Sequence, residues 1–470
     1  MKVLLVNPPL SGLERKNPVR LRLFSNAMPL GICYLAAYLG RAGIDVDIID
    51  GAATGIDLIP MVESICRLRP DVMGITSTSV SFHRAVELAE SVKKKLGSDF
   101  PIVLGGAHLS AVPLEAMAHE CFDYGVYGEG EETFTQLVSA LGAGRGADDI
   151  PGVYYRQEGK ILFTSPRPLI TNLDAIPFPR RNLLNTSLYT SLPTDVRRLP
   201  KFSILANRGC PFNCIFCDSA VVGKSYRTAS PGYLADEMEM LKKDFGAREI
   251  FFVGTTFTVS REHTEAFLSE LERRRLDMMW TCSTRVDVVD LELLSRMKKA
   301  GCWAIRFGIE SGSQKVLDFI RKGINLDQAR KAVEDCARAG INAKAFFMVG
   351  HLNDTRETIR ESIDFAKSLP LTDLTVQINT PLPNTEQFRR AKEFGTLDTR
   401  DYSRYSFFEP VFTPHGMTPE ELVSLQRQFY REFFWRPAPL IRQAQKLLNW
   451  NTFRNYIKCA DLIYHLTLKR

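Results

Sequence analysis

Three cysteines stand close together with a spacing that suits metal chemistry. Cys210, Cys214 and Cys217 follow the pattern C-x3-C-x2-C, directly after a segment, 203–206, that reads as a buried strand. Iron–sulfur clusters require thiolate ligands, and a complete four-iron cluster takes four of them. Three cysteines in one loop therefore leave one iron open to a substrate or cofactor. Two alternatives remain, which are a chance grouping and a zinc site, although zinc would usually bring a fourth Cys or His nearby.

The residues around this loop resemble the radical S-adenosylmethionine (SAM) superfamily, which has the same cysteine spacing with an aromatic residue before the third cysteine. Phe216 occupies that position. The resemblance implies a [4Fe–4S] cluster whose open iron is chelated by SAM. An electron from the reduced cluster would then cleave SAM to a 5′-deoxyadenosyl radical. An electron donor such as a flavodoxin or ferredoxin is implied as well.

Later segments resemble the same superfamily and supply candidate SAM-binding residues. Residues 308–313 (GIESGS) resemble the segment that contacts the ribose and methionine parts of SAM; the alternative is a tight turn with a solvated glutamate. Residues 347–350 (FMVG) resemble the segment near the adenine. Several arginines could meet the methionine carboxylate, although each arginine alone is more often a salt-bridge partner. The candidates are Gly308, Glu310, Ser311, Gly350 and Arg285, with Arg227 and Arg306 as further arginines.

Residues 1–140 alternate between strand-like and helix-like segments, which predicts a doubly wound, Rossmann-like α/β domain. Ligands of such sheets bind beyond the carboxyl ends of the strands. We expect strands at 3–6, 46–49, 72–75, 102–104 and 124–127, and helices at 31–42, 61–67, 82–96 and 113–119.

This N-terminal region resembles the cobalamin-binding domain that precedes the barrel in one large radical SAM subfamily. The resemblance gives Gly105, Gly106, His108, Gly128 and Glu129 as candidate cobalamin-binding residues. The D-x-H-x-x-G motif that supplies a cobalt ligand in many cobalamin proteins is absent. Cobalamin would therefore bind without a protein imidazole, with His108 structural or near the corrin edge. A flavodoxin-like domain that binds nothing is the alternative.

The rest of the chain divides into three regions. Residues 141–200 are rich in proline and read as an ordered linker. Residues 201–395 contain six βα units, which predict a partial (β/α)6 radical SAM barrel, because a complete eight-stranded barrel needs about 250 residues. Residues 396–470 read as a helical, basic C-terminal region, with nine Lys/Arg against two Asp/Glu between 425 and 470.

Two segments depart from the subfamily pattern. Gly254 and Thr255 stand where the family commonly has two aspartates, so no acid role transfers to them. Residues 351–355 (HLNDT) interrupt the usual G-x-P-G-x-T pattern.

The resemblance implies methylation of an unactivated carbon. A substrate radical would take a methyl group from cobalamin, at a site that we expect at the domain interface; the substrate-side catalytic residues are not identified. The alternatives are cyclisation, oxidation or rearrangement without methyl transfer, and RNA modification by the basic, aromatic tail. No RNA-binding module is visible, which argues against nucleic acid.

The partner and location that we expect follow from the tail and from hydropathy. The tail could contact an anionic membrane surface, and it hints at a small or hydrophobic substrate such as a lipid, terpenoid or tetrapyrrole. No signal peptide or membrane-spanning stretch is visible, so we expect a cytoplasmic protein with peripheral membrane contact.

Overall fold

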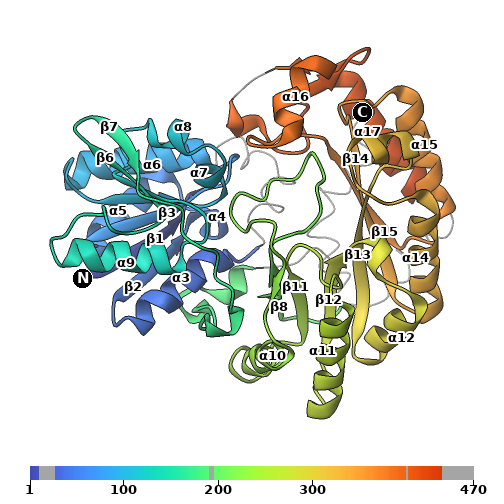
Figure 1. The fold of residues 1–470 in the computed structure, drawn as a ribbon, viewed down its shortest axis with the longest axis horizontal. Helices are drawn as coiled ribbons and strands as arrows, with labels where there is room; N and C mark the ends of the chain where they lie inside the picture. The colour runs from blue at the N-terminus through green and yellow to red at the C-terminus, as the bar shows by residue number, and fades with distance from the viewer. Residues whose placement is uncertain (10–26, 190–194, 399–400, 437–470) are drawn as a thin grey trace. The chain divides into compact units, whose positions relative to one another are not determined.

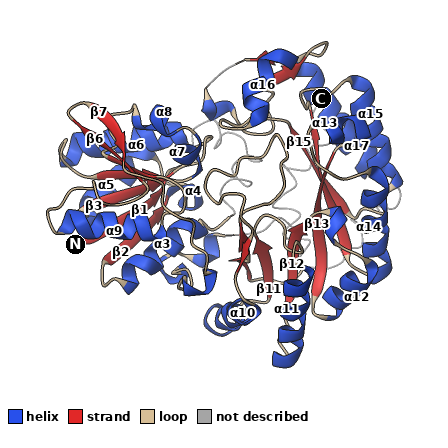
Figure 2. Ribbon diagram, in the orientation of Figure 1, coloured by secondary structure: helices blue, strands red, loops and turns tan. Residues whose placement is uncertain are grey.

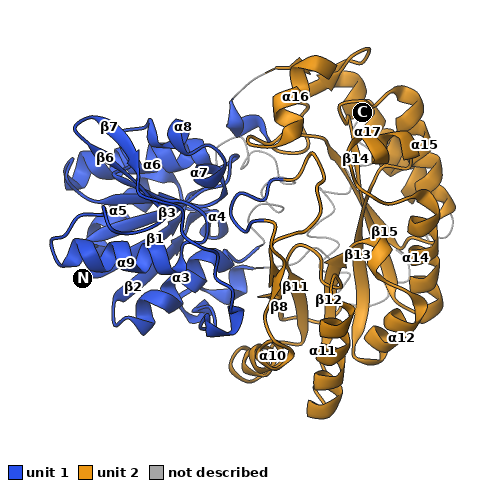
Figure 3. Ribbon diagram, in the orientation of Figure 1, with its two compact units in different colours: residues 1–190, 218–223, 400–405 blue, residues 191–217, 224–399, 406–470 orange. Residues whose placement is uncertain are grey.

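The fold is given by a computed structural model, which describes residues 1–9, 27–189, 195–398 and 401–436. Contacts divide the chain into two compact units (Figure 3). Unit 1 comprises residues 1–190, 218–223 and 400–405, and unit 2 comprises residues 191–217, 224–399 and 406–470.

Unit 1 is built on a seven-stranded sheet. Its strands are β1 (Lys2–Asn7), β2 (Asp45–Asp50), β3 (Val72–Thr76), β4 (Ile102–Gly105), β5 (Tyr124–Val126), β6 (Val153–Gln157) and β7 (Lys160–Phe163). The spatial order is β2-β1-β3-β4-β5-β6-β7, and the first five strands are parallel. Order 2-1-3-4-5 is that of a doubly wound fold, in which ligands bind at the carboxyl edge where the strand order reverses. The predicted Rossmann-like fold is confirmed.

Helices cover both faces of this sheet, as the alternation of buried residues along β1 shows. Val3 and Leu5 pack with residues of α3 (Leu30–Arg41) and α9 (Glu131–Gly142), whereas Leu4 and Val6 pack with residues of α5 (Leu58–Leu68) and α6 (Phe82–Leu96). A parallel strand between two helical layers is apolar on both sides, which explains the unbroken apolar run 3–6. The described residues of this unit also form the short helices α4 (Gly51–Thr54), α7 (Ala107–Ala111) and α8 (Pro113–Met117).

The hairpin β6–β7 lies within the segment 141–200 that we expected to be a linker. The structure instead adds this hairpin to the N-terminal sheet, where β6 pairs antiparallel with β5. Tyr154 and Phe163 face each other across the hairpin with stacked rings 4.4 Å apart. The chain then continues through the short turns η1 (Leu173–Ala175), η2 (Arg181–Leu183) and η3 (Thr186–Leu188). Unit 1 therefore extends to residue 190 rather than ending near 140.

Unit 2 contains a six-stranded parallel sheet with its strands in chain order (Figure 2). They are β8 (Lys201–Leu205), β11 (Glu249–Val253), β12 (Met279–Thr284), β13 (Cys302–Glu310), β14 (Asn342–Val349) and β15 (Asp373–Ile378). Among the described residues β8 and β15 do not pair, so the barrel is open. All six strands lie within residues 201–395, where the sequence predicts six βα units, and the partial barrel is confirmed.

Helices connect successive strands of this barrel (Figure 1). Each begins at a side chain that accepts a hydrogen bond from the first turn, as N-cap residues do. These caps are Ser230, Ser260, Asp290, Asn325 and Thr355. The helices are α10 (Pro231–Phe245), α11 (Arg261–Arg274), α12 (Leu291–Lys299), α14 (Leu326–Ala339) and α15 (Arg356–Ser368); η5 (Val286–Val288) follows β12 and α13 (Gln314–Phe319) follows β13.

The C-terminal region adds α16 (Glu386–Phe394), β16 (Gly395–Leu397), η6 (Tyr402–Arg404), β17 (Phe412–Pro414) and α17 (Pro419–Phe434). A capping box between Thr418 and Glu421 starts α17, and the Tyr430 hydroxyl lies 2.9 Å from the Val376 nitrogen of β15. Phe433, an aromatic residue of the basic tail, is fully buried. The tail residues after 436 lie outside the described part of the chain.

None of the described helices combines the length and the apolar character needed to cross a bilayer.

Candidate functional site

The three cysteines lie in one loop at the carboxyl end of β8. This loop follows β9 (Asn207–Arg208), which pairs antiparallel with β10 (Arg227–Thr228). Its midpoint is fixed by Ile215, which is buried. The Ile215 N–H donates to the Ile320 carbonyl at 3.1 Å, and its own carbonyl accepts from the Gln387 N–H at 3.0 Å. The loop is therefore held between the end of α13 and the start of α16.

The donor atoms of this loop fit an iron–sulfur cluster. Cys210 and Cys214 are half-buried and Cys217 is exposed. Burial raises the pKa of Cys214, while the positive charges of Lys322 and Arg285 partly oppose that rise. In the described part of the chain no three His, Cys, Asp or Glu side chains converge as they would on one ion. Three thiolates from one loop are the kind of ligand that an iron–sulfur cluster requires, and such a cluster binds each thiolate at a separate iron.

A hydrogen-bonded group at the start of the loop explains one departure from the family pattern. The Asn207 side-chain oxygen accepts from the Thr255 N–H at 2.8 Å, and the Thr255 hydroxyl lies 2.6 Å from the Gly209 carbonyl. A Cβ on Gly254 would lie 2.6 Å from the same Asn207 oxygen. Aspartate carboxylates at 254 and 255 would place further hydrogen-bond acceptors beside the Asn207 side-chain oxygen and the Gly209 carbonyl, which are acceptors themselves. Gly254 and Thr255 therefore position the loop by neutral contacts.

The end of β13 forms a tight, buried ion pair. The Glu310 carboxylate lies 2.8 Å from the Lys322 ammonium, with side chains 11% and 8% exposed. Glu310 has φ +73°, a conformation that is strained for a residue with a side chain. A Cβ on Gly308 would lie 2.4 Å from the Glu310 oxygen and 2.9 Å from the Lys322 nitrogen. A side chain at position 308 would therefore have to displace this ion pair, and the alternative of a solvated glutamate is wrong.

Sequence analysis missed Lys322, because nothing in its local pattern marks it. The lysine follows α13 and reaches the site only through the fold. Its ammonium lies 5.9 Å from the ring of Phe216 in the cysteine loop. Ser311, by contrast, is a predicted residue with a structural contact, since its buried hydroxyl lies 3.1 Å from that of Ser362.

The turn after β14 holds a second predicted residue, Gly350. Gly350 has φ +84°, and its N–H and that of His351 both donate to the Asp354 carboxylate at 2.9 Å. Burial raises the pKa of Asp354 to about 6. The His351 side chain is fully buried, and its ring centroid lies 6.1 Å from that of Phe216. Burial lowers the pKa of His351 to about 4, so its imidazole is neutral near pH 7.

The three candidate arginines lie in different surroundings. Arg285 bonds Asp287 at 2.8 Å, and its guanidinium carbon lies 3.7 Å from the centre of the Phe212 ring in the cysteine loop. Arg227 lies in β10, opposite β9. Arg306 is bound by Asp195 at 3.2 Å, and Asp195 precedes β8, at the amino ends of the strands. Arg306 is therefore held away from the cysteine loop, in a salt bridge.

The predicted residues of unit 1 gather along the carboxyl edge of its sheet. Gly105 ends β4, and Gly106 follows with φ +96°. A Cβ on Gly106 would lie 2.6 Å from the Ser77 carbonyl, whereas one on Gly105 would meet no atom within 4 Å. The Gly128 N–H donates to Ser110 at 3.1 Å, and the Glu129 carboxylate accepts from the Ile170 N–H at 2.8 Å. Glu129 thus fastens the segment after the hairpin.

His108 is packed between aromatic rings. It is fully buried, its Nδ1 lies 3.1 Å from the Ser79 hydroxyl, and its ring lies 4.0 Å from Phe82 and 5.0 Å from Tyr402. This packing accounts for a structural role of the histidine.

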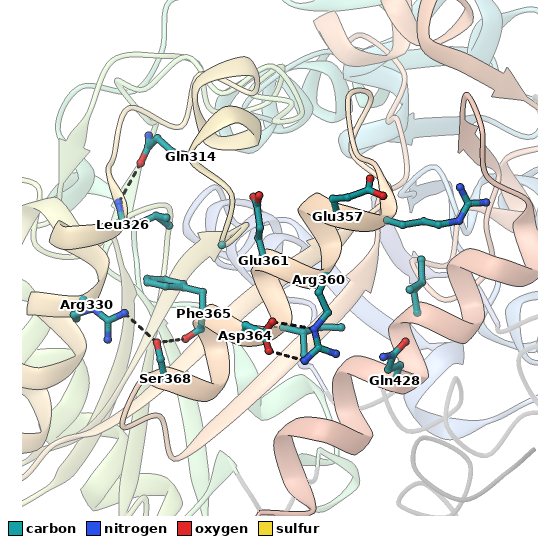
Figure 4. Close-up of a pocket in the computed structure, with 14 residues that line it drawn as sticks. Gln314, Leu326, Arg330, Glu357, Arg360, Glu361, Asp364, Phe365, Ser368 and Gln428 are labelled. Carbon is teal, nitrogen blue, oxygen red and sulfur yellow. Dashed lines mark hydrogen bonds and ion pairs between the residues drawn. The ribbon is translucent and has the colours of Figure 1, made fainter.

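An open groove lies elsewhere, against the outer helices α14, α15 and α17 (Figure 4). Arg360 bonds Asp364 at 2.6 Å, and Arg330 bonds the Ser368 hydroxyl at 3.0 Å. The lining of the groove includes none of the three cysteines and mostly comes from the outer helices, so we do not assign the activity to it.

Removal of the Lys322 charge should destabilise the protein. Lys322→Met leaves the Glu310 carboxylate buried without its partner, and breaking a buried pair typically lowers the free energy of unfolding by about 3–5 kcal/mol. Lys331→Met is the matched control, because that side chain is 69% exposed and its partner Asp335 keeps Arg338. Urea unfolding of the cofactor-free chain measures both. Equal urea midpoints for the two variants would show that the Glu310–Lys322 pair contributes no more to stability than the Lys331–Asp335 pair does.

Comparison with known proteins agrees with this geometry. Residues 204–366 match the radical SAM superfamily, and residues 17–138 match the B12 binding domain. The chain is 34% identical to an uncharacterized methyltransferase of Pyrococcus horikoshii over 444 residues, 94% of each protein. It is 31% identical to the anaerobic magnesium-protoporphyrin IX monomethyl ester cyclase of Rubrivivax gelatinosus, over 88% of this chain and 75% of that protein.

Among solved structures, the radical SAM methyltransferase TsrM of Kitasatospora setae, with cobalamin and a [4Fe–4S] cluster bound, has the same fold. The TM-score is 0.71 at 18% identity, over 93% of this chain and 89% of that chain. The two matched domains and the relative that is similar over 94% of its length indicate the same family. The chain belongs to the family of cobalamin-dependent radical SAM enzymes, whose cofactors are a [4Fe–4S] cluster, SAM and cobalamin.

Proposed function

We propose that this enzyme transfers a methyl group to an unactivated carbon of a small or hydrophobic metabolite. One observation carries the proposal: a cobalamin-binding segment and a radical SAM segment stand in one chain that resembles, along nearly its whole length, a protein named as a methyltransferase. When bound, the cluster supplies the electron that cleaves SAM, and cobalamin supplies the methyl group. We also propose that an external one-electron donor, such as a flavodoxin or ferredoxin, reduces the cluster.

In unit 2 we propose that Cys210, Cys214 and Cys217 bind the cluster and that SAM lies beside the ends of β13 and β14. Three features support this placement: the loop presents three neighbouring thiols, Lys322 offers a cation for the methionine carboxylate, and the glycine at 308 leaves the Glu310–Lys322 pair undisturbed. The residues that we assign to SAM are Phe216, Gly308, Glu310, Ser311, Gly350 and Arg285, and we propose Lys322 in addition.

In unit 1 we propose that cobalamin lies on the carboxyl edge of the sheet, near Gly105, Gly106 and Gly128. The open space beside Gly105 supports this placement. His108 is enclosed by rings and Glu129 is bonded to the backbone, so both act by shaping the edge. We assign cobalamin binding to the first 140 residues, with the hairpin β6–β7 as an addition to the same sheet.

The substrate class is proposed from the relatives. The similarity to a cyclase of a magnesium porphyrin favours a flat, hydrophobic substrate such as a tetrapyrrole. The same similarity favours oxidative ring closure without methyl transfer as the second candidate function. The basic residues beyond 425 support peripheral contact with anionic lipid.

A labelled methyl donor distinguishes the two candidate functions. The reconstituted enzyme is incubated with deuteromethyl-SAM, a reductant and a metabolite extract from a strain that lacks the gene. We expect deuterated methyl in a product, together with both 5′-deoxyadenosine and S-adenosylhomocysteine, measured by mass spectrometry. Deoxyadenosine without S-adenosylhomocysteine, and a product without label, would contradict methyl transfer and favour cyclisation.

The placement of cobalamin is tested by the pair of glycines after β4. Gly105→Ala adds a methyl group where the protein leaves space, so we expect normal folding with at least tenfold weaker cobalamin binding. Gly106→Ala clashes with Ser77 and also requires a side chain at φ +96°, so we expect a lower unfolding temperature. Gly232→Ala in the first turn of α10 makes only ordinary contacts and serves as the control. Cobalamin binding is measured by absorbance titration. If Gly105→Ala binds cobalamin as tightly as the wild type, the corrin lies elsewhere.

A further inference from the structure

Two short segments of unit 2 connect the centre of the cysteine loop to the protein surface. The Ile215 backbone, next to Cys214, bonds one residue at the end of α13 and one at the start of α16. Arg321 and Glu386 are the chain neighbours of these two partners, and their side chains form an ion pair at 2.8 Å. Ile215 is buried, whereas the Arg321 side chain is 56% exposed. The surface at this ion pair is therefore close to the cysteine loop.

The surface around this ion pair carries an excess of positive charge. We call residues 315–321 and 386–393 the basic face, because they include five basic residues and three acidic ones. The Glu386 carboxylate is shared by Arg321 and Arg390, at 2.8 and 3.4 Å. Three cations of the basic face are exposed and form no ion pair with any carboxylate that the structure describes, namely Lys315, Arg389 and Lys392.

The outer helices of the same barrel balance their charges differently. Every arginine of α11 and α15 pairs with at least one carboxylate; these are Arg261, Arg273, Arg274, Arg356 and Arg360. An ordinary solvated helix surface of this protein thus neutralises its arginines internally. The basic face leaves charge over, and a partner with negative charge would complement it.

The basic face also has an apolar centre. The rings of Phe319 in α13 and Phe394 in α16 lie 5.1 Å apart, and the Arg390 guanidinium lies 5.2 and 5.0 Å from them. Both rings are partly buried. An apolar centre with a polar rim is the usual anatomy of a non-obligate interface, in which arginine is enriched. Weak electron-transfer complexes bury less than about 1,200 Å² in total, so a face of two short segments suits a small, transient partner.

The position of the basic face indicates what this partner does. The rate of electron transfer falls steeply with the distance between the two redox centres, so a protein donor must dock on a surface close to the cluster. The basic face is linked by hydrogen bonds to Ile215, between two of the cysteines. It also consists of residues other than those that we assign to SAM, so a donor could dock there while SAM is bound.

We propose that the basic face docks a small, acidic electron-transfer protein that reduces the cluster. The inference rests on the proposed function and identifies the surface that its external donor uses. In the step itself one electron passes from the donor to the cluster. The donor is oxidised by one electron, the cluster becomes more negative by one charge, and no bond is made or broken.

A double variant tests the basic face. Arg321→Gln with Arg389→Gln removes two exposed charges, and Glu386 keeps Arg390 as its partner. The reconstituted protein is mixed, without SAM, with a reduced flavodoxin that has an acidic surface around its flavin. Stopped-flow loss of the visible cluster absorbance gives the rate of reduction, and dithionite serves as a small reductant that needs no docking surface. Titration with oxidised flavodoxin measures binding apart from electron transfer.

The matched control is Arg273→Gln with Arg338→Gln, in the last turns of α11 and α14. These side chains are 68% and 66% exposed, and their carboxylate partners each keep a second basic residue. The control therefore removes the same charge from another part of unit 2.

The expected result separates docking from the cluster itself. At low ionic strength we expect flavodoxin to reduce the basic-face variant about tenfold more slowly than the wild type, because electrostatic steering raises association rates by 10–10³. The variant should also bind oxidised flavodoxin more weakly, and its rate should depend less on salt. Dithionite should reduce it at the wild-type rate. The control should match the wild type with both reductants.

The contrary outcomes are distinct. If flavodoxin reduces the basic-face variant as fast as the wild type, or if the control slows equally, the inference is overturned while the cluster stands. If dithionite slows as much as flavodoxin does, the arginines support the loop and the inference fails. If the variant instead loses self-association in sedimentation, or binding to anionic vesicles, with flavodoxin rates unchanged, the face belongs to a second copy or to lipid and the inference fails. If no reductant finds a cluster in the wild type, the proposed function is overturned as well.

Discussion

The structure depends on the fixed path of one loop. Two backbone hydrogen bonds at Ile215 hold the loop centre between α13 and α16, and Thr255 holds its beginning through Gly209. Cys210 and Cys214 precede that fixed centre, and Cys217 lies just beyond it. A thiolate loop must keep its shape when iron and an extra ligand bind, because ligand placement of this kind tolerates little error. The partial barrel supplies the anchors, since Ile320, Gln387 and Thr255 all follow different strands.

Strain and unmet hydrogen bonds occur near this loop, at the ends of β13 and β14. Glu310 adopts a positive φ, which costs on the order of 1–3 kcal/mol for a residue with a side chain, and His351 lacks partners within the described chain. Lys322 is buried against Glu310. The protein accepts these costs at neighbouring strand ends, and strained or unpaired groups are characteristic of binding sites.

Sequence alone predicts the parts of the fold that have local or periodic signals. The six barrel strands are apolar runs followed by helices, and residues such as Ser230 and Thr355 are of the types that cap helix starts. The cysteine loop and residues 308–310 are short motifs with fixed spacing. The hairpin β6–β7 falls in the predicted linker because its pairing with β5 is non-local.

The site residues that sequence analysis missed depend on contacts between distant segments. Lys322 and His351 carry no local signal, because their meaning comes from the fold that brings them to Phe216. Arg306 is a candidate by its position near a strand end, but its side chain pairs with Asp195, a partner that no sequence pattern identifies.

The central claim is that one iron of a cluster on Cys210, Cys214 and Cys217 is open to SAM. The most direct measurement is electron paramagnetic resonance of the reduced, reconstituted protein with SAM that carries 17O in its carboxylate and 15N in its amino group. The account predicts hyperfine coupling from both labels to the cluster in the wild type. A well-formed [4Fe–4S] signal that shows no coupling to either label at saturating SAM would contradict it.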